Sequence, residues 1–377
     1  MTDNPGILWT ILSFLLVIGP LIFVHELGHY FVGRAFGIKA DVFSIGFGRE
    51  IAGWTDARGT RWKLAWLPLG GYVKFAGDMN PAGQASPEWL ALPAEERSRT
   101  FQAKPVWQRF LVVLAGPATN FLAAILILSG FNVAYGVPRT PPVIGAFAKN
   151  SPASAAGLRI GDRIVRMDGR TIDHFEDVPP IVALKLGGPI KVEIERAGRR
   201  FQLDVSPRTV VEKDRFGNEN RRPMLGIGAA DQVLARVSPL GAVGASVQQC
   251  WVVVATTLEG LEQIVTGQRS VKEMGGPAKI AKFSGEQASL GLLAFLWFMA
   301  VISINLGFIN LLPIPMLDGG HLFFYGIEAV RRKPLRPEAQ EWAFRTGLAA
   351  LLALMVLVTF NDLASFGLWS KLGGLID

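Results

Sequence analysis

Long apolar runs, nearly free of charges, dominate the hydropathy pattern and predict helices that cross a membrane. Each run is close to the 20 residues that a helix needs to cross the hydrocarbon core of a bilayer. Four such runs cover residues 7–31, 106–132, 290–312 and 342–360. They predict a polytopic α-helical membrane protein with four transmembrane helices, of which the first is kinked at Pro20.

A fifth run, at residues 240–265, is less apolar because it contains several glutamine and glutamate residues. The topology decides how it is interpreted. Basic residues cluster at 34–109 and 331–336, and such clusters stay on the cytoplasmic side of a membrane. With four crossings both clusters are cytoplasmic and both termini lie outside, whereas a fifth crossing would place 331–336 outside. We therefore predict an amphipathic helix at 240–265 that lies in the outer membrane interface.

Two segments between these runs alternate apolar and polar residues with the period of β-strands. Residues 40–78 are broken by glycines and predict two membrane-associated β-hairpins, of which the stretch 67–75 is apolar enough to enter the membrane. Residues 143–207 combine strand-like patterns with a helical stretch at 176–186 and end in a hairpin around Ala197-Gly198. They predict a compact α+β domain, which the topology puts on the outer side.

The composition agrees with a membrane protein. Only 18% of the 377 residues are charged and 50% are hydrophobic, whereas soluble proteins carry about 25% charged residues. The net charge of +7 could indicate nucleic-acid binding, but the basic residues flank the apolar runs, so we expect no nucleic-acid partner. The single cysteine, Cys250, excludes a disulfide framework within the chain and is expected to be a buried apolar residue. The first run lacks the flanks of a signal peptide and should be retained.

The first apolar run ends in FVHELGHYFVGR, which carries the HExxH pattern of zinc hydrolases. On a helix, His25 and His29 lie one turn apart on one face, so both imidazoles can reach one zinc ion. Glu26 lies beside the first ligand, where it can take a proton from a zinc-bound water. Burying these groups at membrane depth is costly unless they pair or bind metal, which favours a metal site over a merely polar helix end.

A catalytic zinc site takes three protein ligands and keeps one position open, so a further ligand must come from elsewhere. His174 falls in the outer domain and is expected on its surface. The stretch NLLPIPMLDGGH at 310–321 ends on the same side of the membrane as the first run and offers Asp318 and His321. Its prolines and glycines break a helix at membrane depth, which often marks a site. Either residue could be the ligand, and Asp318 could instead cap a helix.

Together these stretches resemble the site-2 protease family of intramembrane zinc metalloproteases, and more narrowly its bacterial regulator-of-sigma-E protease branch. HELGH and NLLPIPMLDGGH carry the resemblance, and FSIGFG, LGGYVKFAGD and GPATN agree with it. SPASAAGLRIGDRIVRMDG fits the pattern of the PDZ domains found in bacterial proteases. The resemblance covers nearly the whole chain. It implies that one zinc ion is held by His25, His29 and Asp318, with Glu26 as the catalytic base.

The resemblance also implies a set of substrate-binding residues, since a protease that acts on a helix must unwind it and satisfy the freed backbone groups. An edge strand can do so by β-strand addition, and an asparagine can do so with its amide. The set consists of Leu69, Gly70, Gly71, Tyr72, Asn310 and Pro313. Asn310 could instead form a hydrogen bond between helices, and Asn120 is expected to be structural.

For the inserted domain the resemblance implies one PDZ domain, whereas better-known members of the branch carry two in tandem; residues 208–239 are too short for a second. Its loop at Ala156, Gly157, Leu158, Arg159 and Ile160 is expected to bind a peptide carboxylate through backbone amides. The alternative, which we favour, is a steric gate that admits only substrates already trimmed outside.

The chain is thus predicted to be a membrane protease core with one insertion. The parts are 1–135 (the first half of the core, with the hairpin region 40–78), 143–207 (the PDZ domain), 208–288 (a linker with the interfacial helix) and 289–377 (the second half of the core).

The expected function is that of a zinc endopeptidase of the bacterial inner membrane, with its PDZ domain outside and its active site towards the cytoplasm. In regulated intramembrane proteolysis it would cleave the transmembrane segments of single-span proteins. The substrates would be proteins already cut outside, such as an anti-sigma factor, or remnant signal peptides. The alternative is a non-enzymatic membrane PDZ scaffold with a structural or relict metal site. Glu26, which a structural zinc does not need, favours the enzyme.

Overall fold

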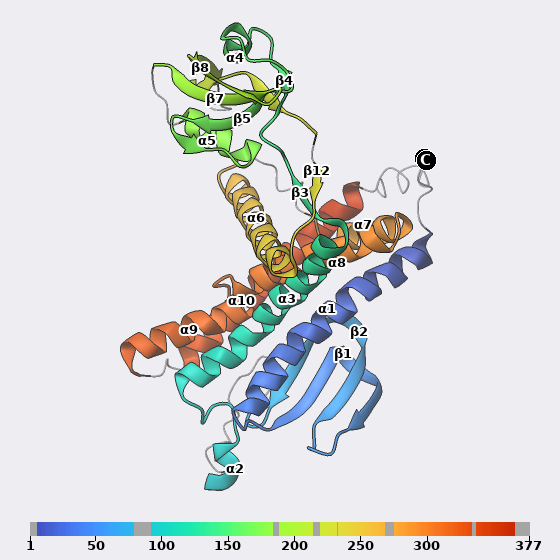
Figure 1. Ribbon diagram of the computed structural model, residues 1–377. Helices are drawn as coiled ribbons and strands as arrows, with labels where there is room; N and C mark the ends of the chain where they lie inside the picture. Colours follow the sequence, from blue (N-terminus) through green and yellow to red (C-terminus); the bar gives the residue numbers. More distant parts are fainter. Residues whose placement is uncertain are drawn as a thin grey trace, which may run out of the picture. The chain divides into compact units, whose positions relative to one another are not determined.

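The computed structural model describes residues 6–78, 92–183, 188–213, 219–231, 233–267, 275–333 and 337–365 (Figure 1). The chain folds as two compact units. We call Met1–Ser129 with Ser246–Asp377 the membrane unit, and Gly130–Ala245 the inserted unit. Each is described by itself.

The membrane unit is built on long helices, two of which, α3 and α6, continue into the inserted unit. The helices are α1 (Ile7–Ala35), α2 (Ala94–Ser98), α3 (Val106–Tyr135), α6 (Pro239–Val265), α7 (Pro277–Ser289), α8 (Leu292–Leu311), α9 (Asp318–Arg331) and α10 (Pro337–Ser365). Among the described residues, α1, α3, α6, α8 and Gln340–Asp362 of α10 are long and apolar enough to cross a membrane. The four predicted runs are therefore helical, but length and composition allow one crossing more than predicted.

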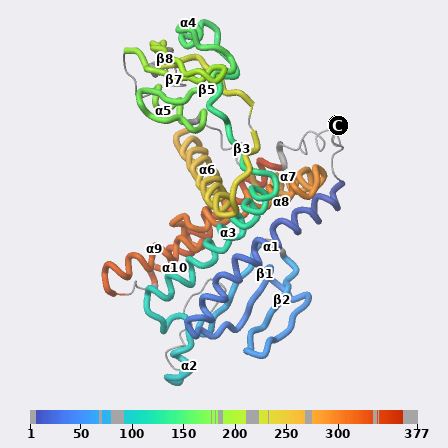
Figure 2. The backbone as a smooth tube through the Cα atoms, viewed as in Figure 1, coloured from blue at the N-terminus to red at the C-terminus, as the bar shows by residue number. Residues whose placement is uncertain are grey.

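The first two long helices, α1 and α3, run antiparallel and side by side (Figure 2). The Thr119 hydroxyl of α3 donates to the carbonyl of Val24 in α1, at 3.0 Å. One turn further along α1, His29 Nδ1 lies 2.8 Å from the carbonyl oxygen of Val112, which comes earlier in α3. The residue numbers therefore rise along α1 in the direction in which they fall along α3, so the two helices are antiparallel.

The late helix α8 is also antiparallel to α3. The Ser303 hydroxyl donates to the carbonyl of Asn120 at 2.8 Å, and further along α8 a Cβ on Gly307 would lie 3.0 Å from the Pro117 carbonyl oxygen. Because both helices oppose α3, α1 and α8 run in the same direction, and their C-terminal ends lie on the same side of the bundle. This arrangement brings HELGH close to the stretch that follows α8.

Between α1 and α3 the chain forms two long strands, β1 (Ala40–Thr55) and β2 (Arg61–Phe75), which pair with each other. The prediction of two separate hairpins is wrong. Each strand bends, so that Val42–Ile45 finds partners in both Arg61–Leu64 and Gly71–Lys74. Gly46 and Gly48 of β1 have φ of +90° and +89°, a region in which other residues are strained. Glycine-rich bends therefore let one strand serve two pairings, which the alternation pattern alone did not reveal.

The helix at 240–265 forms as predicted, with bounds Pro239–Val265. Cys250 is buried, as expected, and packs with Ala124 of α3 and Ile304 of α8. The Thr257 hydroxyl lies 2.9 Å from Asn305 Oδ1, in the interior of α8. The helix thus packs against α3 and α8 with one face, a contact that the prediction of a helix lying in the outer interface did not include.

The inserted unit contains short helices and strands. They are β3 (Val137–Arg139), β4 (Ile144–Phe147), α4 (Pro152–Ala155), β5 (Arg163–Met167), β6 (Arg170–Thr171), the 3₁₀ helix η2 (Phe175–Asp177), α5 (Val178–Ala183), β7 (Ile190–Arg196), β8 (Arg199–Val205), β9 (Arg208–Lys213), β10 (Glu219–Met224), β11 (Ile227–Ala229) and β12 (Val233–Ala235). One sheet has the order β6-β5-β7-β8, and β4–β11, β3–β12 and β9–β10 form further pairs. Part of the helical stretch expected at 176–186 lies outside the described residues.

Alternation in the strands builds the core of this unit. Ile190, Val192 and Ile194 of β7 point inward and are at most 1% exposed, as expected for a strand with one buried face. Leu225 belongs to the same core, and β11 pairs with β4. The unit therefore extends beyond the predicted boundary at residue 207, because strands of three residues leave too short a pattern to be recognised.

Candidate metal centre

The two histidines of HELGH lie near the C-terminal end of α1, on the face that packs against α3. The Nδ1 atom of His29 lies 2.8 Å from the carbonyl oxygen of Val112. The Nδ1 atom of His25 lies 3.0 Å from the side-chain amide of Asn120, which is fully buried. These contacts on Nδ1 leave the Nε2 atoms of both rings facing each other, 3.2 Å apart.

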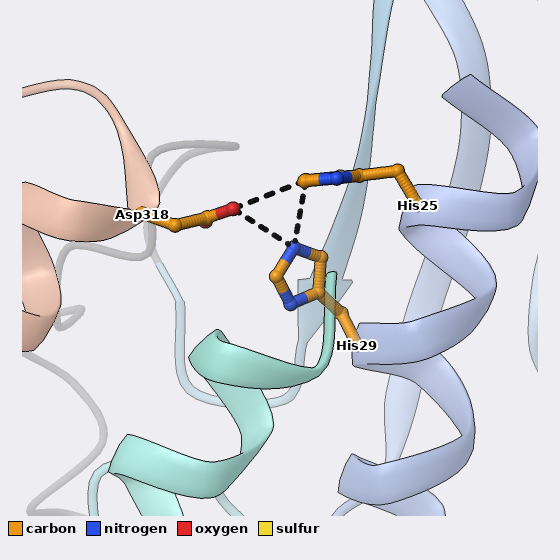
Figure 3. Close-up of side chains that lie close together, drawn as sticks. All are labelled: His25, His29 and Asp318. Atoms are coloured by element: carbon orange, nitrogen blue, oxygen red, sulfur yellow. Dashed lines mark hydrogen bonds and ion pairs between the residues drawn. The ribbon is translucent and has the colours of Figure 1, made fainter. Parts of the chain in front are cut away.

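Asp318 completes a cluster with the two histidines (Figure 3). Its Oδ2 atom lies 3.0 Å from His25 Nε2 and 3.5 Å from His29 Nε2. The chain breaks after α8 and turns through 312–317, where Met316 has φ of +83°, before α9 begins at Asp318. The N-cap position of α9 is held by Leu317, and Asp318 is the first helical residue. The capping alternative is thus disfavoured, and the carboxylate points at the imidazoles.

A metal ion fits this cluster. Asp318 Oδ2 is buried and has no hydrogen bond among the described residues, although two ring nitrogens face it. Three ligands at zinc bond lengths in a tetrahedron lie about 3.3 Å apart, and the three separations here are 3.0, 3.2 and 3.5 Å. Two neutral imidazoles and a carboxylate are a donor set that zinc accepts, with one position left open.

The close fit of α3 against the cluster depends on Gly116. A Cβ at this position would lie 2.8 Å from His25 Nε2 and closer still to His29 Nε2. Any larger residue would therefore displace the atoms that face the third ligand. The glycine of GPATN thus lets α3 form the wall behind both rings.

Asn120, which was expected to be structural, contacts His25 Nδ1 and is placed where it can orient the ring. A histidine that binds metal through Nε2 carries its proton on Nδ1 and needs an acceptor there. The structure places Asn120 Nδ2 at this position, 3.0 Å from His25 Nδ1. Half a turn of the amide about its last bond brings Oδ1 there as the acceptor. The only sequence signal was a polar residue within an apolar run, which also fits a hydrogen bond between helices.

We predict that Asn120→Leu weakens zinc binding about ten- to hundredfold, the usual effect of removing a group that orients a ligand. Asn120→Asp, which keeps an acceptor, should stay closer to the wild-type affinity. Competition for zinc against a chelator of known affinity measures both variants. Equal affinity of Asn120→Leu and the wild type would contradict this role.

A cavity of about 760 Å³ contains the cluster. Glu26 is buried and lies on its wall, as do Asn310, Gly70, Gly71 and Tyr72. Strand β2 approaches α1 closely, and the Val73 amide donates a hydrogen bond to the Glu26 carboxylate. The candidate base, the candidate ligands and most of the predicted substrate residues therefore share one space.

Other predicted residues lie elsewhere. Pro313 is exposed and does not line the cavity, and the side chain of Leu69 lies outside the described residues. His321 lines the cavity, but its ring packs against Phe344 at 4.8 Å between centroids and is not in the metal-binding group. His174 caps the 3₁₀ helix of the inserted unit and is partly buried. Of the two ligand candidates, the geometry favours Asp318.

Two polar side chains outside the metal cluster, Asp78 and Tyr325, also line the cavity. The Asp78 carboxylate accepts hydrogen bonds from the Phe75 amide at 3.0 Å and from the Gln102 side chain at 2.5 Å. Burial raises the pKa of Asp78 to about 7 and also raises the pKa of the Tyr325 phenol. Both residues line the cavity, so together they can bind water there.

The predicted carboxylate-binding loop of the inserted unit uses its amides internally. The amides of residues 156–158 donate to carbonyls of α4 and its flanks. The Arg159 amide donates to Asp162 at 2.7 Å, and Arg196 forms an ion pair with the same carboxylate. Burial opposes ionisation of Asp162, but these hydrogen bonds outweigh it and lower the pKa of the carboxyl. As folded, the loop does not offer these amides to a peptide terminus.

Comparison with known proteins assigns the chain to a family. The sequence profile described as Peptidase family M50 matches residues 13–354, which is most of the chain. The chain belongs to this family. The resemblance to site-2 proteases that the motifs indicated is thereby confirmed.

Relatives of this M50 peptidase match along nearly their whole length. A protein of Agrobacterium fabrum that bears the provisional name of a zinc metalloprotease is 44% identical, over 94% of this chain and 96% of its own. Metalloprotease MmpA of Caulobacter vibrioides is 38% identical, over 98% of this chain and 99% of its own.

Part of this M50 peptidase also matches a solved structure. The PDZ domain of an SdrC-like protein from Listeria monocytogenes aligns with 25% of the chain and 92% of its own, at 20% identity and a TM-score of 0.20. Because that score is low, any interpretation of the inserted unit depends on its own strand topology.

Proposed function

We propose that this M50 peptidase is a zinc-dependent endopeptidase that cleaves the transmembrane segments of other proteins. The observation that carries the proposal is the buried cluster of His25, His29 and Asp318, which shares a cavity with Glu26 among helices apolar enough to cross a membrane. The provisional names of its relatives also support zinc. We assign one zinc ion to this cluster.

In this proposal the two histidines and Asp318 hold the ion, while Val112 and Asn120 fix the orientation of the rings. Zinc supplies Lewis acidity, which polarises a carbonyl and lowers the pKa of a water molecule. The Glu26 carboxylate takes the proton of the attacking water and delivers it to the leaving amide nitrogen. The hydrogen bond from the Val73 amide keeps Glu26 oriented towards the cavity.

The cavity wall supports a substrate held as an extended strand. A helix in a membrane has its peptide groups satisfied internally, so a protease must unwind it and replace those hydrogen bonds. Strand β2 offers Gly70, Gly71 and Tyr72 on the wall, where strand addition can supply backbone partners. Asn310 comes from α8, far from β2 in sequence, but lies on the same cavity wall and supplies a side-chain amide. Pro313 is exposed and does not line the cavity, and it stays a predicted substrate residue.

Four full crossings, by α1, α3, α8 and α10, fit the helix directions best. Both α1 and α8 oppose α3, so the chain must cross the membrane an even number of times between the end of α3 and the start of α8. A single crossing by α6 would reverse α8 and separate Asp318 from the histidines. In this proposal α6 docks on α3 and α8, and the chain is outside again at Leu292.

The topology predicts the labelling of single cysteines placed in a chain whose own Cys250 is replaced by alanine. A membrane-impermeant thiol reagent applied to spheroplasts should label a cysteine in place of the exposed Asp204 of the inserted unit. A cysteine in place of the exposed Lys333 should react only after the membrane is permeabilised. Labelling of position 333 from outside would contradict the four-crossing arrangement.

The inserted unit is proposed to be a single PDZ domain on the outer side of the bacterial inner membrane, acting as a steric gate. The internal use of the amides at 156–159 supports a gate over capture of a peptide carboxylate. Suitable substrates are then single-span proteins already cut outside, such as anti-sigma factors, and remnant signal peptides. In this proposal α1 begins and α10 ends on the outer side, and the metal centre lies towards the cytoplasm.

Removal and return of the metal tests the proposal. The purified protein, reconstituted with a single-span test substrate, should lose cleavage on prolonged chelation and regain it with one equivalent of zinc per chain. Substrate that stays intact with a full complement of zinc would overturn the proposal and leave a membrane scaffold with a structural metal site.

A further inference from the structure

An ion pair joins α3 to α9 within the membrane unit. Arg109 of α3 places Nη2 2.7 Å from Oε1 of Glu328 in α9, although 219 residues separate them in sequence. Their side chains are only 17% and 14% exposed. An ion pair so far removed from water is weak evidence for overall stability, but it can fix the register between two elements.

Arg109 has two further contacts that hold its guanidinium in place. Its Nε donates to the carbonyl of Lys104 at 3.1 Å. Its Cζ lies 4.9 Å from the centre of the Tyr325 ring, in cation–π geometry. The planar guanidinium thus touches two successive turns of α9, which a lysine ammonium cannot do in the same way.

The residues that Arg109 contacts share a face of α9 with the metal ligand. Asp318, Tyr325 and Glu328 are spaced seven and then three residues apart, which places them along one side of a helix. Glu328 lies ten residues from Asp318, about 15 Å along the axis. A helix is stiff over this length, so fixing its later turns also fixes the carboxylate at its start.

No continuous helix sets the direction of α9, although its first turn packs on the end of α8 and its side chains contact Phe344 of α10. Residues 312–317 break the path from α8, and the turn contains Met316 at positive φ. Helix α3 already positions both histidines through Val112 and Asn120. Through Arg109 the same helix also positions the element that carries Asp318.

We propose that Arg109 is a positioning residue for the metal centre: it clamps α9 to α3, so that Asp318 meets the two histidines in binding geometry. The inference rests on the proposed zinc centre and adds to it the group that assembles the ligands from two distant parts of the chain. Loss of Arg109 is expected to raise the rate at which zinc dissociates. It should change activity only because less of the protein then carries zinc.

The test measures the rate at which zinc leaves the full-length protein in detergent when a chromogenic chelator is present. Arg109→Met, which keeps the aliphatic stem, should release zinc about tenfold faster, within the range seen when an orienting group is lost. Arg109→Lys should fall between Arg109→Met and the wild type. Exchanging the charges in one chain, Arg109→Glu with Glu328→Arg, should restore part of the loss relative to Arg109→Glu alone.

The matched control is Arg345→Met, which breaks an exposed ion pair with Glu341 on α10 and should release zinc at the wild-type rate. If Arg109→Met does not fold, Glu328→Gln decides, because it leaves Arg109 over the Tyr325 ring and removes only the ion pair. Wild-type zinc release from folded Arg109→Met, or from Glu328→Gln in its place, would overturn the clamp. A wrong assignment of the zinc centre gives a different result, because Asp318→Asn would then bind zinc with the same affinity as the wild type.

Discussion

Glutamine in place of Glu26 should lower cleavage by a factor of about 10² to 10⁴, the usual contribution of a general base, while the protein keeps its zinc. The substitution preserves the shape of the side chain and removes only its ability to accept a proton. Glu26 is buried in the cavity that holds the metal ligands and is none of the three. Metal analysis of the purified variant, together with cleavage of a single-span substrate, measures both effects.

The matched control is Glu95→Gln, at an exposed position of the short helix α2. It makes the same chemical change outside the cavity and should cleave at the wild-type rate. Undiminished cleavage by Glu26→Gln would remove Glu26 as the base. Loss of zinc together with activity would instead make Glu26 part of the metal-binding set.

Asparagine in place of Asp318 should weaken zinc binding at least about a hundredfold, beyond the ten- to hundredfold loss that follows removal of a group that only orients a ligand. The amide is neutral and a poorer ligand, and the carboxylate oxygen it replaces lies 3.0 and 3.5 Å from the two imidazole nitrogens. Zinc content after dialysis and competition with a chelator report the change.

His321→Ala is the control for Asp318→Asn, because His321 lies one turn along the same helix and lines the same cavity. It should keep its zinc, since its ring packs against Phe344 rather than facing the cluster. If Asp318→Asn binds zinc as the wild type does and His321→Ala loses it, His321 is the ligand and Asp318 is not.

The local part of the metal centre could be predicted from the sequence because helical periodicity alone puts His25 and His29 on one face. The distant ligand could only be narrowed to Asp318 or His321, since both follow the same helix break. The structure separates them. His321 follows Asp318 by three residues in α9, and its ring packs against Phe344, whereas the Asp318 carboxylate faces the imidazoles. A side-chain direction of this kind depends on packing between helices, which no spacing rule supplies.

The parts of the site that could not be predicted from the sequence are contacts between residues far apart in the chain. Asn120 faces His25 across 95 positions, and Arg109 meets Glu328 across 219. Each is a polar residue in or beside an apolar run, and such a residue can equally serve packing between helices. The pairing of β1 with β2 was missed for a similar reason, because alternation predicts strands but not their partners.

The helices were predicted more reliably than the limits of the inserted unit. Twenty or more apolar residues leave a strong pattern, so α1, α3, α8 and α10 could be located from the sequence. The three-residue strands β11 and β12 leave almost none, although they pair with β4 and β3 and close the unit. The unit therefore extends well beyond residue 207.

The position of the cut is the sharpest test of cleavage within the membrane. A single-span substrate with labelled flanks is reconstituted in vesicles with the wild-type protein, and the masses of both products locate the broken peptide bond. We expect one principal cut within the membrane-spanning segment, absent with Glu26→Gln and after zinc removal. A cut only in the flanks outside the membrane, or a cut inside it that persists with Glu26→Gln, would rule out cleavage within the membrane by this zinc centre.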